Sequence, residues 1–246
     1  PYANVKRFFK PELKISYVEN ELEKQQEELS ASKNIKKAVR EIDKNRPMVA
    51  LTFDDGPHPE YTRSILKALN QHKGAATFYV LGNRATSYPG VIEEIIIQGS
   101  EVGNHSWSHS NYSNREAADI KEDKDKVQNA VKAITGSAPE TIRVPYGSTN
   151  ATVESSVELP IVLWSVDTND WKDKNSKVII ERATSNIKDG DIILMHDIWG
   201  ETANAVPEIV KTLSDKGFQL VTVSEMMNAR NVDIKKGKKY FSFLKK

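Results

Sequence analysis

The sequence predicts an α/β fold in which β/α units repeat around a parallel sheet or barrel. From Pro47 onward, short apolar runs alternate with longer amphipathic stretches, an order typical of such units. The runs are almost entirely apolar, as expected of strands that are covered on both faces. At 246 residues the chain is near the size at which one hydrophobic core still suffices. We therefore expect one domain or two small ones.

Seven apolar runs are expected to form the strands. In chain order they cover residues 48–53, 75–82, 100–105, 141–147, 159–167, 191–197 and 218–223. Helices are expected over residues 61–72, 88–99 and 118–136, from Asn175 or Ser176, through Val206, Ile209 and Leu213, and over 224–230. Several helical stretches are followed by a glycine, which commonly ends a helix. Both the expected strands and the expected helices therefore support an alternating β/α order.

The two ends of the chain differ from this pattern. Residues 1–46 are crowded with charge and carry only a thin apolar series, which predicts a charged helical N-terminal arm or linker. Residues 47–230 form the expected main domain, and residues 231–246 a basic C-terminal tail. Because the chain begins at Pro1 rather than Met, we expect a fragment or a processed product. A signal or anchor segment upstream is compatible with that expectation.

Composition excludes several classes of protein. The 35 Lys and Arg nearly balance the 34 Asp and Glu, which argues against a protein that binds duplex nucleic acid, because such proteins normally carry a marked basic excess. No apolar run reaches the ~18 residues that a membrane-spanning helix needs. Cysteine is absent, so disulfide scaffolds, thiolate metal sites and cysteine nucleophiles are excluded.

Titratable side chains stand at the ends of five expected strands. Asp54 and Asp55 end the first run and His105 the third. Arg143, Asp167 and His196 end the fourth, fifth and sixth runs. The carboxyl ends of the strands of a β/α barrel open on one face, where active sites lie. These groups are therefore expected to converge on a single rim.

Two histidines and an aspartate in this set suggest a metal site. His105 and His109 are spaced i, i+4, which places both imidazoles on one side of a helical turn. A His, His, Asp set with an open fourth position is the layout of a hydrolytic zinc site. Water in that position would reach a pKa of about 7 and become a nucleophile at neutral pH. The second aspartate would be free to accept its proton, with Arg143 and His196 as its neighbours.

These residues belong to five motifs that resemble a known family. In order they are TFDDGP (52–57), HSWSH (105–109), RVPYG (143–147), DTNDW (167–171) and LMH (194–196). They are similar to the five motifs of NodB-homology polysaccharide deacetylases, carbohydrate esterase family 4. The resemblance covers roughly residues 47–229 and implies a distorted (β/α)7 barrel, the NodB-like deacetylase fold.

The resemblance also implies a role for each site residue. Asp54 matches the catalytic base, and Asp55, His105 and His109 match the metal ligands. Arg143 matches the residue that orients the base, and the backbone N–H of Tyr146 matches the oxyanion donor. His196 matches the general acid, and Asp167 the carboxylate that holds it. Leu194 and Trp171 match the apolar walls around the acetyl methyl group.

The expected activity is metal-dependent removal of acetyl groups from N-acetylglucosamine residues of a polysaccharide, with bacterial peptidoglycan as the first choice. Zinc is the expected ion, with cobalt as the alternative. A chitin or chitooligosaccharide deacetylase, an O-acetyl esterase of the xylan type and a non-catalytic glycan-binding protein remain open. We expect a bacterial, secreted or cell-surface protein that is monomeric and binds no nucleic acid. It would meet a membrane only if an N-terminal anchor preceded this chain.

Overall fold

The structure, a computed structural model, describes residue 38 and residues 40–244. Most of the predicted N-terminal arm therefore lies outside the described residues. Within the described part of the chain, none of the helices combines the length and the apolar character that a membrane span requires.

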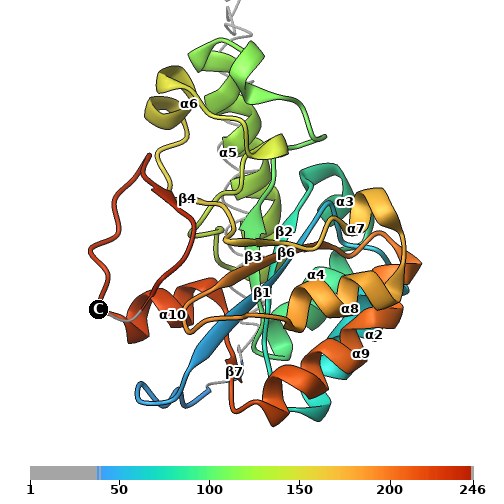
Figure 1. The fold of residues 1–246 in the computed structure, drawn as a ribbon. Coiled ribbons are helices and arrows are strands. Elements are labelled where there is room, and N and C mark those ends of the chain that lie inside the picture. Colours follow the sequence, from blue (N-terminus) through green and yellow to red (C-terminus); the bar gives the residue numbers. More distant parts are fainter. Residues whose placement is uncertain (1–37, 39, 245–246) are drawn as a thin grey trace, which may run out of the picture.

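Five parallel strands form a continuous part of the barrel wall, which we call the regular arc. Its order is β3 (Glu101–Asn104), β2 (Thr77–Val80), β1 (Met48–Asp54), β6 (Ile192–His196) and β5 (Val166–Asp167). The short strand β7 (Gln219–Leu220) pairs with the start of β1. β1 pairs with β6 in a register that sets Asp54 opposite His196. The central strands and their carboxyl ends are visible in Figure 1.

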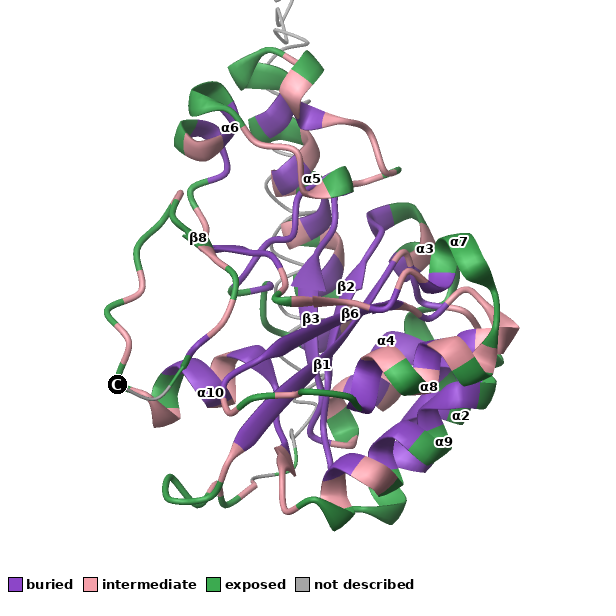
Figure 2. Ribbon diagram, in the orientation of Figure 1, coloured by how far each residue is buried: buried purple, intermediate pink, exposed green. Residues whose placement is uncertain are grey.

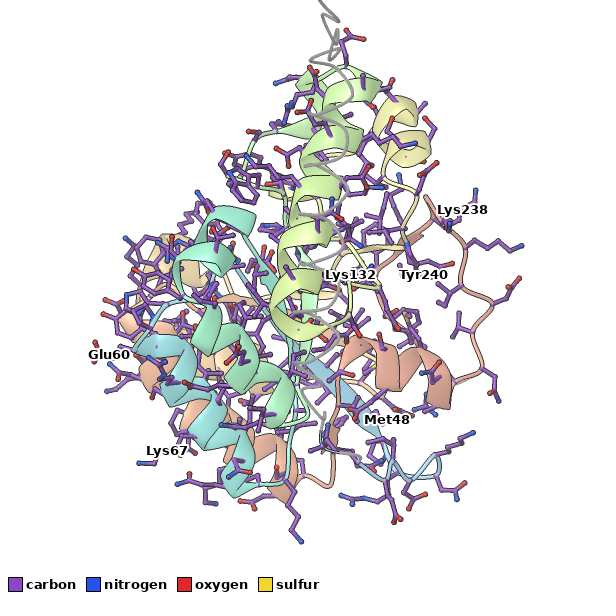
Figure 3. The ribbon with its side chains drawn as sticks, turned by 180° about the vertical axis from the view of Figure 1, so that it is seen from behind. Met48, Glu60, Lys67, Lys132, Lys238 and Tyr240 are labelled. Atoms are coloured by element: carbon purple, nitrogen blue, oxygen red, sulfur yellow. The ribbon has the colours of Figure 1, made fainter. Side chains whose placement is uncertain are left out.

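The rest of the wall, which we call the irregular arc, contains much shorter pairings. Ile142 forms isolated parallel bridges to Asn104 of β3 and to Ile161. Strand β4 (Ile161–Val162) then pairs with β8 (Lys239–Tyr240), near the C-terminus. A single antiparallel bridge between Asp191 and Ser242 joins the C-terminal segment to the region before β6. Figure 3 labels Lys238 and Tyr240 on this segment.

Helices cover the outside of the strands. They are α2 (Tyr61–Gln71), α3 (Gly82–Ser87), α4 (Pro89–Ile97), α5 (Ala117–Thr135), α6 (Ala151–Ser156), α7 (Asp170–Asp173), α8 (Ser176–Thr184), α9 (Gly200–Asp215) and α10 (Val223–Ala229). Two 3₁₀ turns, η1 (Tyr112–Asn114) and η2 (Pro145–Gly147), interrupt the loops. Figure 1 shows α2, α8 and α9 together on one side of the central strands.

Local sequence explains where several helices begin and end. The Asn175 side chain accepts hydrogen bonds from the N–H groups of Lys177 and Val178, which caps α8. Thr222 and Glu225 form a reciprocal capping box at the start of α10. Gly136 follows α5 with a φ of 83°, the left-handed conformation that glycine adopts without strain.

A large part of the hydrophobic core lies between β1 and the helices α2 and α9. All seven residues of β1 are buried, as the purple strands of Figure 2 show. Apolar side chains of α2 and α9, such as Ile65, Leu66, Ile209 and Leu213, pack in the same cluster as Phe53. A strand buried on both faces cannot place polar side chains in its middle without partners, which explains the apolar runs of the sequence.

The predicted α/β barrel fold is confirmed, with three differences in its strands. In the fourth run, residues 141–147, only Ile142 pairs with other strands, through two isolated bridges. The fifth run splits into β4 and β5, because Leu163 N–H bonds to the Tyr240 carbonyl whereas Ser165 N–H bonds to that of Ile192. The backbone thus changes partner within this run.

The third difference is at the C-terminus, where the predicted basic tail supplies β8 to the barrel wall. The residues before the predicted boundary at Pro47 also contact the main domain. Arg40 pairs with Glu225 at 2.7 Å and donates to the Leu220 carbonyl at 2.8 Å. Both ends of the described chain therefore pack on the barrel.

Candidate active site

A cleft of about 350 Å³ opens at the carboxyl ends of the strands. Its lining includes every sequence-predicted site residue except Arg143, together with Gly147 and Trp164. The lining residues are Asp54, Asp55, His105, His109, Tyr146, Gly147, Trp164, Asp167, Trp171, Leu194 and His196. The predicted convergence of strand ends on one rim is thus seen directly.

Asp55, His105 and His109 lie close enough to share one metal ion. Nε2 of His105 is 3.5 Å from Asp55 Oδ1, and Nε2 of His109 is 3.4 Å from the same oxygen. Nδ1–H of His105 donates to the Arg143 carbonyl at 2.6 Å. That bond fixes the ring and leaves Nε2 free to bind a cation, the usual arrangement of a metal-ligating histidine.

The electrostatics of this triad suit a cation. Asp55 Oδ1 is buried and receives no hydrogen bond within the described residues. Burial raises the pKa of Asp55, but the interactions with His105 and His109 outweigh it and lower the pKa to about 2. Burial lowers the pKa of His109, which favours its neutral, ligating form. A buried carboxylate oxygen without a donor beside two imidazoles fits a divalent ion of the zinc class.

Strained backbone surrounds the triad. Asp55, Ser106, His109 and Tyr146 all have left-handed φ angles, between 61° and 71°. Such residues cost energy and cluster at functional sites, where they aim side chains that regular structure would misdirect. The HSWSH segment is accordingly a loop, and no helical turn is present over His105 and His109. The i, i+4 spacing works here through the turn at Ser106 and His109.

Gly56 of the first motif is required by close packing. A Cβ atom at this position would lie 2.2 Å from Oδ1 of Asp197. Asp197 is fully buried and its Oδ2 accepts a hydrogen bond from Thr62 at 2.5 Å. Burial raises the pKa of Asp197 to about 7. The glycine therefore lets the loop that carries Asp54 and Asp55 lie against β6.

Arg143 lies behind the cleft and holds Asp54. It is fully buried, and its Nη1 donates to Asp54 Oδ1 and to Thr52 Oγ1, each at 2.8 Å. Its remaining donors reach the backbone, with Nε to the Val162 carbonyl at 3.0 Å and Nη2 to the Leu163 carbonyl at 2.9 Å. The guanidinium also lies 4.3 Å above the Tyr79 ring. The orientation of the Asp54 carboxylate is therefore set by a buried side chain that is itself held by three further hydrogen bonds.

His196 is held by Asp170, and the predicted contact with Asp167 is wrong. Nδ1 of His196 lies 2.8 Å from Asp170 Oδ1, and the His196 backbone N–H donates to Asp170 Oδ2 at 2.7 Å. Burial lowers the pKa of His196, but the hydrogen bond and charge of Asp170 outweigh it and raise the pKa to about 9. The imidazole is therefore protonated at neutral pH.

Asp167 has a different place in the same motif. Its Oδ1 accepts the backbone N–H of Asn169 at 2.8 Å, which stabilises the turn after β5. Asn169 adopts a left-handed φ of 50°, and this turn carries Asp170 beneath His196. Asp170 is fully buried, whereas Asp167 lines the open cleft. The prediction is wrong because the turn at Asn169 directs the Asp170 carboxylate, rather than that of Asp167, towards His196 at the end of β6.

Aromatic and apolar side chains form the walls of the cleft. Trp171 and Tyr146 are 50% and 65% exposed and flank the opening. The Tyr146 ring packs edge-on against His109, with the ring centroids 4.5 Å apart. Leu194 is nearly buried at the bottom of the cleft. Exposed aromatic side chains beside a few polar groups are typical of sites that bind sugar rings.

Sequence reasoning missed Asp170, Thr52 and Trp164. DTNDW offers two carboxylates, and the one directly before Trp171 is the one that reaches His196. Thr52 is a polar residue within a buried run, a placement that predicts a hydrogen-bond partner and so a neighbour of interest. Nothing in the local pattern distinguishes Trp164 from the apolar run around it.

Comparisons with known proteins show which families of enzymes this chain resembles. The family model described as "Polysaccharide deacetylase" matches residues 41–161. Peptidoglycan-N-acetylmuramic acid deacetylase PdaC of Bacillus subtilis is 43% identical over 185 residues, which cover 75% of this chain and 40% of that protein. Its solved structure has a TM-score of 0.75 and 42% identity, and the match covers 77% of this chain and 94% of that one.

Two further similar proteins come from other bacteria. A peptidoglycan-N-acetylglucosamine deacetylase of Bacillus cereus is 35% identical over 189 residues, 74% of this chain and 69% of that protein. A family 4 acetyl xylan esterase from Clostridium thermocellum, solved with a cobalt ion, has a TM-score of 0.75 and 32% identity, with 79% of this chain and 98% of that one covered. The chain spans less than half the length of the PdaC protein. The fold, the motif order and these similarities agree, and the chain belongs to the polysaccharide deacetylase family.

Proposed function

We propose that this protein is a metal-dependent deacetylase that removes acetyl groups from N-acetylglucosamine residues of bacterial peptidoglycan. The observation that carries the proposal is the meeting of three groups in one cleft. These are the Asp55, His105 and His109 triad, the Asp54 carboxylate bonded to Arg143, and the His196 imidazole bonded to Asp170.

The residues divide the chemistry between them. A divalent ion held by Asp55, His105 and His109 would supply Lewis-acid chemistry for water and for the acyl oxygen. Asp54 accepts a proton from the water whose oxygen forms the new bond to the acetyl carbon. The backbone N–H of Tyr146 donates to the oxygen that becomes negative as that bond forms.

Cleavage then requires a proton for the leaving group. His196, held protonated by Asp170, donates that proton to the amine nitrogen as the carbon–nitrogen bond breaks. The products are acetate and a free amino sugar. Leu194 and Trp171 supply the apolar walls that receive the acetyl methyl group.

The choice of peptidoglycan is supported by the names of the similar proteins from Bacillus subtilis and Bacillus cereus. An open cleft with exposed aromatic walls also suits a polymer lying across the site better than a small enclosed ligand. We propose zinc as the bound ion, with cobalt as the alternative that the same ligands accept. We propose further that residues 47–230 carry the catalytic groups and that the protein acts as a monomer, secreted or at the cell surface.

Acetate release tests this proposal. The purified chain is incubated with peptidoglycan, chitooligosaccharides and acetylated xylan, each with and without a chelator, and Asp54→Asn serves as the inactive control. We expect release from peptidoglycan that the chelator abolishes, and mass spectrometry of muropeptides should show which amino sugar has lost one acetyl group. Release from chitooligosaccharides alone, or from xylan alone, would replace the substrate. Release from none of the three would favour a glycan-binding protein.

A further inference from the structure

The C-terminal segment, residues 231–244, lies outside the five motifs and outside residues 41–161 that match the family model. We propose that it is a positioning element for the catalytic base, acting through β4 and Arg143 on Asp54. The proposal rests on the proposed function, because it concerns how that reaction's base is held.

The first step is the dependence of Arg143 on two carbonyl groups. Two of its nitrogens donate to the carbonyls of Val162 and Leu163. These carbonyls belong to β4 and the residue after it. A movement of this backbone would therefore move the guanidinium, which is buried and has no other protein acceptors than these, Asp54 and Thr52 among the described residues.

The second step is that one peptide unit joins Arg143 to the C-terminal segment. The peptide between Val162 and Leu163 carries both the carbonyl that accepts from Arg143 and an N–H group. That N–H donates to the Tyr240 carbonyl of β8 at 2.8 Å. A chain of hydrogen bonds thus runs from Tyr240 through this peptide and Arg143 to Asp54. Each bond in such a buried chain polarises and aligns the next.

The third step is that β4, whose two side chains are fully buried, has few other backbone hydrogen-bond partners. β4 contains two residues. On the edge opposite β8, it pairs with a single residue, Ile142, through an isolated parallel bridge. β8 supplies a second bond on the same edge, in which Ile161 N–H donates to the Lys238 carbonyl at 2.9 Å. The backbone hydrogen bonds that align β4 are therefore shared between Ile142 on one edge and the C-terminal segment on the other.

The fourth step concerns what anchors β8. Phe243 is 3% exposed, stacks on the Tyr240 ring at 5.6 Å and belongs to the same apolar cluster as Val162 and Ile192. Its backbone N–H donates to the Gly190 carbonyl at 2.8 Å. A Cβ atom at Gly190 would lie 2.3 Å from the Phe243 carbonyl oxygen, so the segment is closely seated. Phe243 is the one buried residue of segment 231–244, so we expect its truncation to loosen β8 more than any other change in the segment.

Nearby Phe241 offers a matched control. It lies two residues away on the same segment, but 51% of it is exposed. Phe243→Ala removes the anchor, Phe243→Leu retains most of the buried volume, and Phe241→Ala removes an aromatic ring that β8 does not need. All three variants are made in the full chain, and circular dichroism and elemental analysis check that fold and metal content are retained.

Steady-state kinetics then distinguish positioning of the catalytic base from general stabilisation of the fold. We expect Phe243→Ala to lower kcat by about 10-fold with little change in KM, since small misplacements of a catalytic group cost 10- to 100-fold in rate. Phe243→Leu should lose less, and Phe241→Ala should behave like the wild type. A folded Phe243→Ala or Phe243→Leu variant with wild-type kcat would overturn the proposal.

A double-mutant cycle tests the route. Arg143→Lys keeps the charge but removes the Nε donor that reaches Val162, so it cuts the chain between β4 and Asp54. If the segment acts through Arg143, Phe243→Ala should cost less than about twofold in that background. An equal loss of kcat in both backgrounds would overturn the route. Failure of the proposed function itself would look different, because the wild type would then release no acetate.

Discussion

The two arcs of the barrel hold the site in different ways. The regular arc has continuous parallel pairing, and its strand ends carry Asp54, His105 and His196. The irregular arc relies on the bridge at Ile142 and on the two-residue strands β4 and β8, yet the segment that follows Ile142 carries Arg143. The groups assigned to bind metal and move protons thus come from the regular arc. The group that orients one of them comes from the irregular arc.

This difference has a physical consequence. A side chain at the end of a well-paired strand is placed by many backbone hydrogen bonds, so a single substitution elsewhere moves it little. Arg143 is placed by four acceptors of its own, two of which are the backbone carbonyls of Val162 in the weakly paired β4 and of Leu163 directly after it. We therefore expect losses of chemistry from changes in the regular arc and losses of alignment from changes in the irregular arc.

The largest effect is expected from the triad. His105→Ala removes a buried imidazole from the ligand set, and we expect loss of the bound ion together with a fall in activity greater than the ~10²-fold typical of changes outside the ligand shell. Elemental analysis and acetate release measure the two effects, with circular dichroism as the check on folding. His72→Ala, at an exposed histidine that ends α2, is the control and should retain the ion. Full metal occupancy in His105→Ala would remove this residue from the site.

The second effect concerns the base. Asp54→Asn preserves shape and removes the proton acceptor, so kcat should fall by about 10²- to 10⁴-fold, the usual contribution of a general base. Metal content should stay near that of the wild type, because Asp54 is not among the three grouped ligands. Single-turnover kinetics measure the chemical step directly. A variant with near-wild-type turnover would mean that another group accepts the proton.

The same contrast explains how much the sequence predicts. β1, β2, β3 and β6 follow from apolar runs of ordinary length, and the convergence of Asp54, Asp55, His105 and His196 follows from parallel strand order. Both features depend on patterns that repeat along the chain. These four strands of the regular arc and the site residues at their ends are therefore predictable from the sequence.

The irregular arc was harder because its geometry depends on partners distant in sequence. β8 pairs with β4 although its Lys239 lies 78 positions after its partner Ile161, and the segment that leads into and forms it, KKGKKY (235–240), indicates only a basic tail. Asp170 was missed for a local reason. The left-handed turn at Asn169 decides which of two nearby carboxylates reaches His196, and an asparagine in the sequence permits such a turn without requiring it.

The third prediction concerns the acid and uses both carboxylates of that motif. A general acid must be protonated, so activity is lost as the pH rises through the pKa of His196, which Asp170 holds at about 9. Asp170→Asn removes the charge that raises this pKa. The alkaline limb of the kcat profile should therefore move to lower pH, and kcat above neutral pH should fall by about 10-fold or more.

Asp167→Asn is the matched control for this shift. It lies three residues earlier and bonds to the backbone of Asn169 rather than to His196. Its alkaline limb should coincide with that of the wild type when kcat is measured over the same pH range. A limb that moves in Asp167→Asn and stays in Asp170→Asn would restore the assignment that the structure contradicts.

The smallest effect is expected at Thr52, a residue of the regular arc that accepts a hydrogen bond from Arg143 of the irregular arc. Thr52 of β1 donates its hydroxyl to the Ile193 carbonyl of β6 at 2.7 Å, and the same oxygen accepts from Arg143 at 2.8 Å. Thr52→Val keeps the shape of the side chain but removes both bonds, so we expect a loss of about 1–2 kcal/mol in the free energy of unfolding. Arg143 keeps Asp54 as an acceptor, so kcat should fall far less than in Asp54→Asn.

Thr52→Ser separates the hydrogen bonds from the packing. Serine keeps the hydroxyl and gives up one buried methyl group, which is worth about 0.8 kcal/mol. Denaturant unfolding should therefore show a loss in both variants, whereas kcat should fall in Thr52→Val and stay near the wild-type value in Thr52→Ser. If kcat falls equally in both, the packing of β1 rather than the hydroxyl aligns Arg143. If kcat falls in neither, the bonds of Arg143 to β4 suffice to hold Asp54, and the irregular arc aligns the base without help from Thr52.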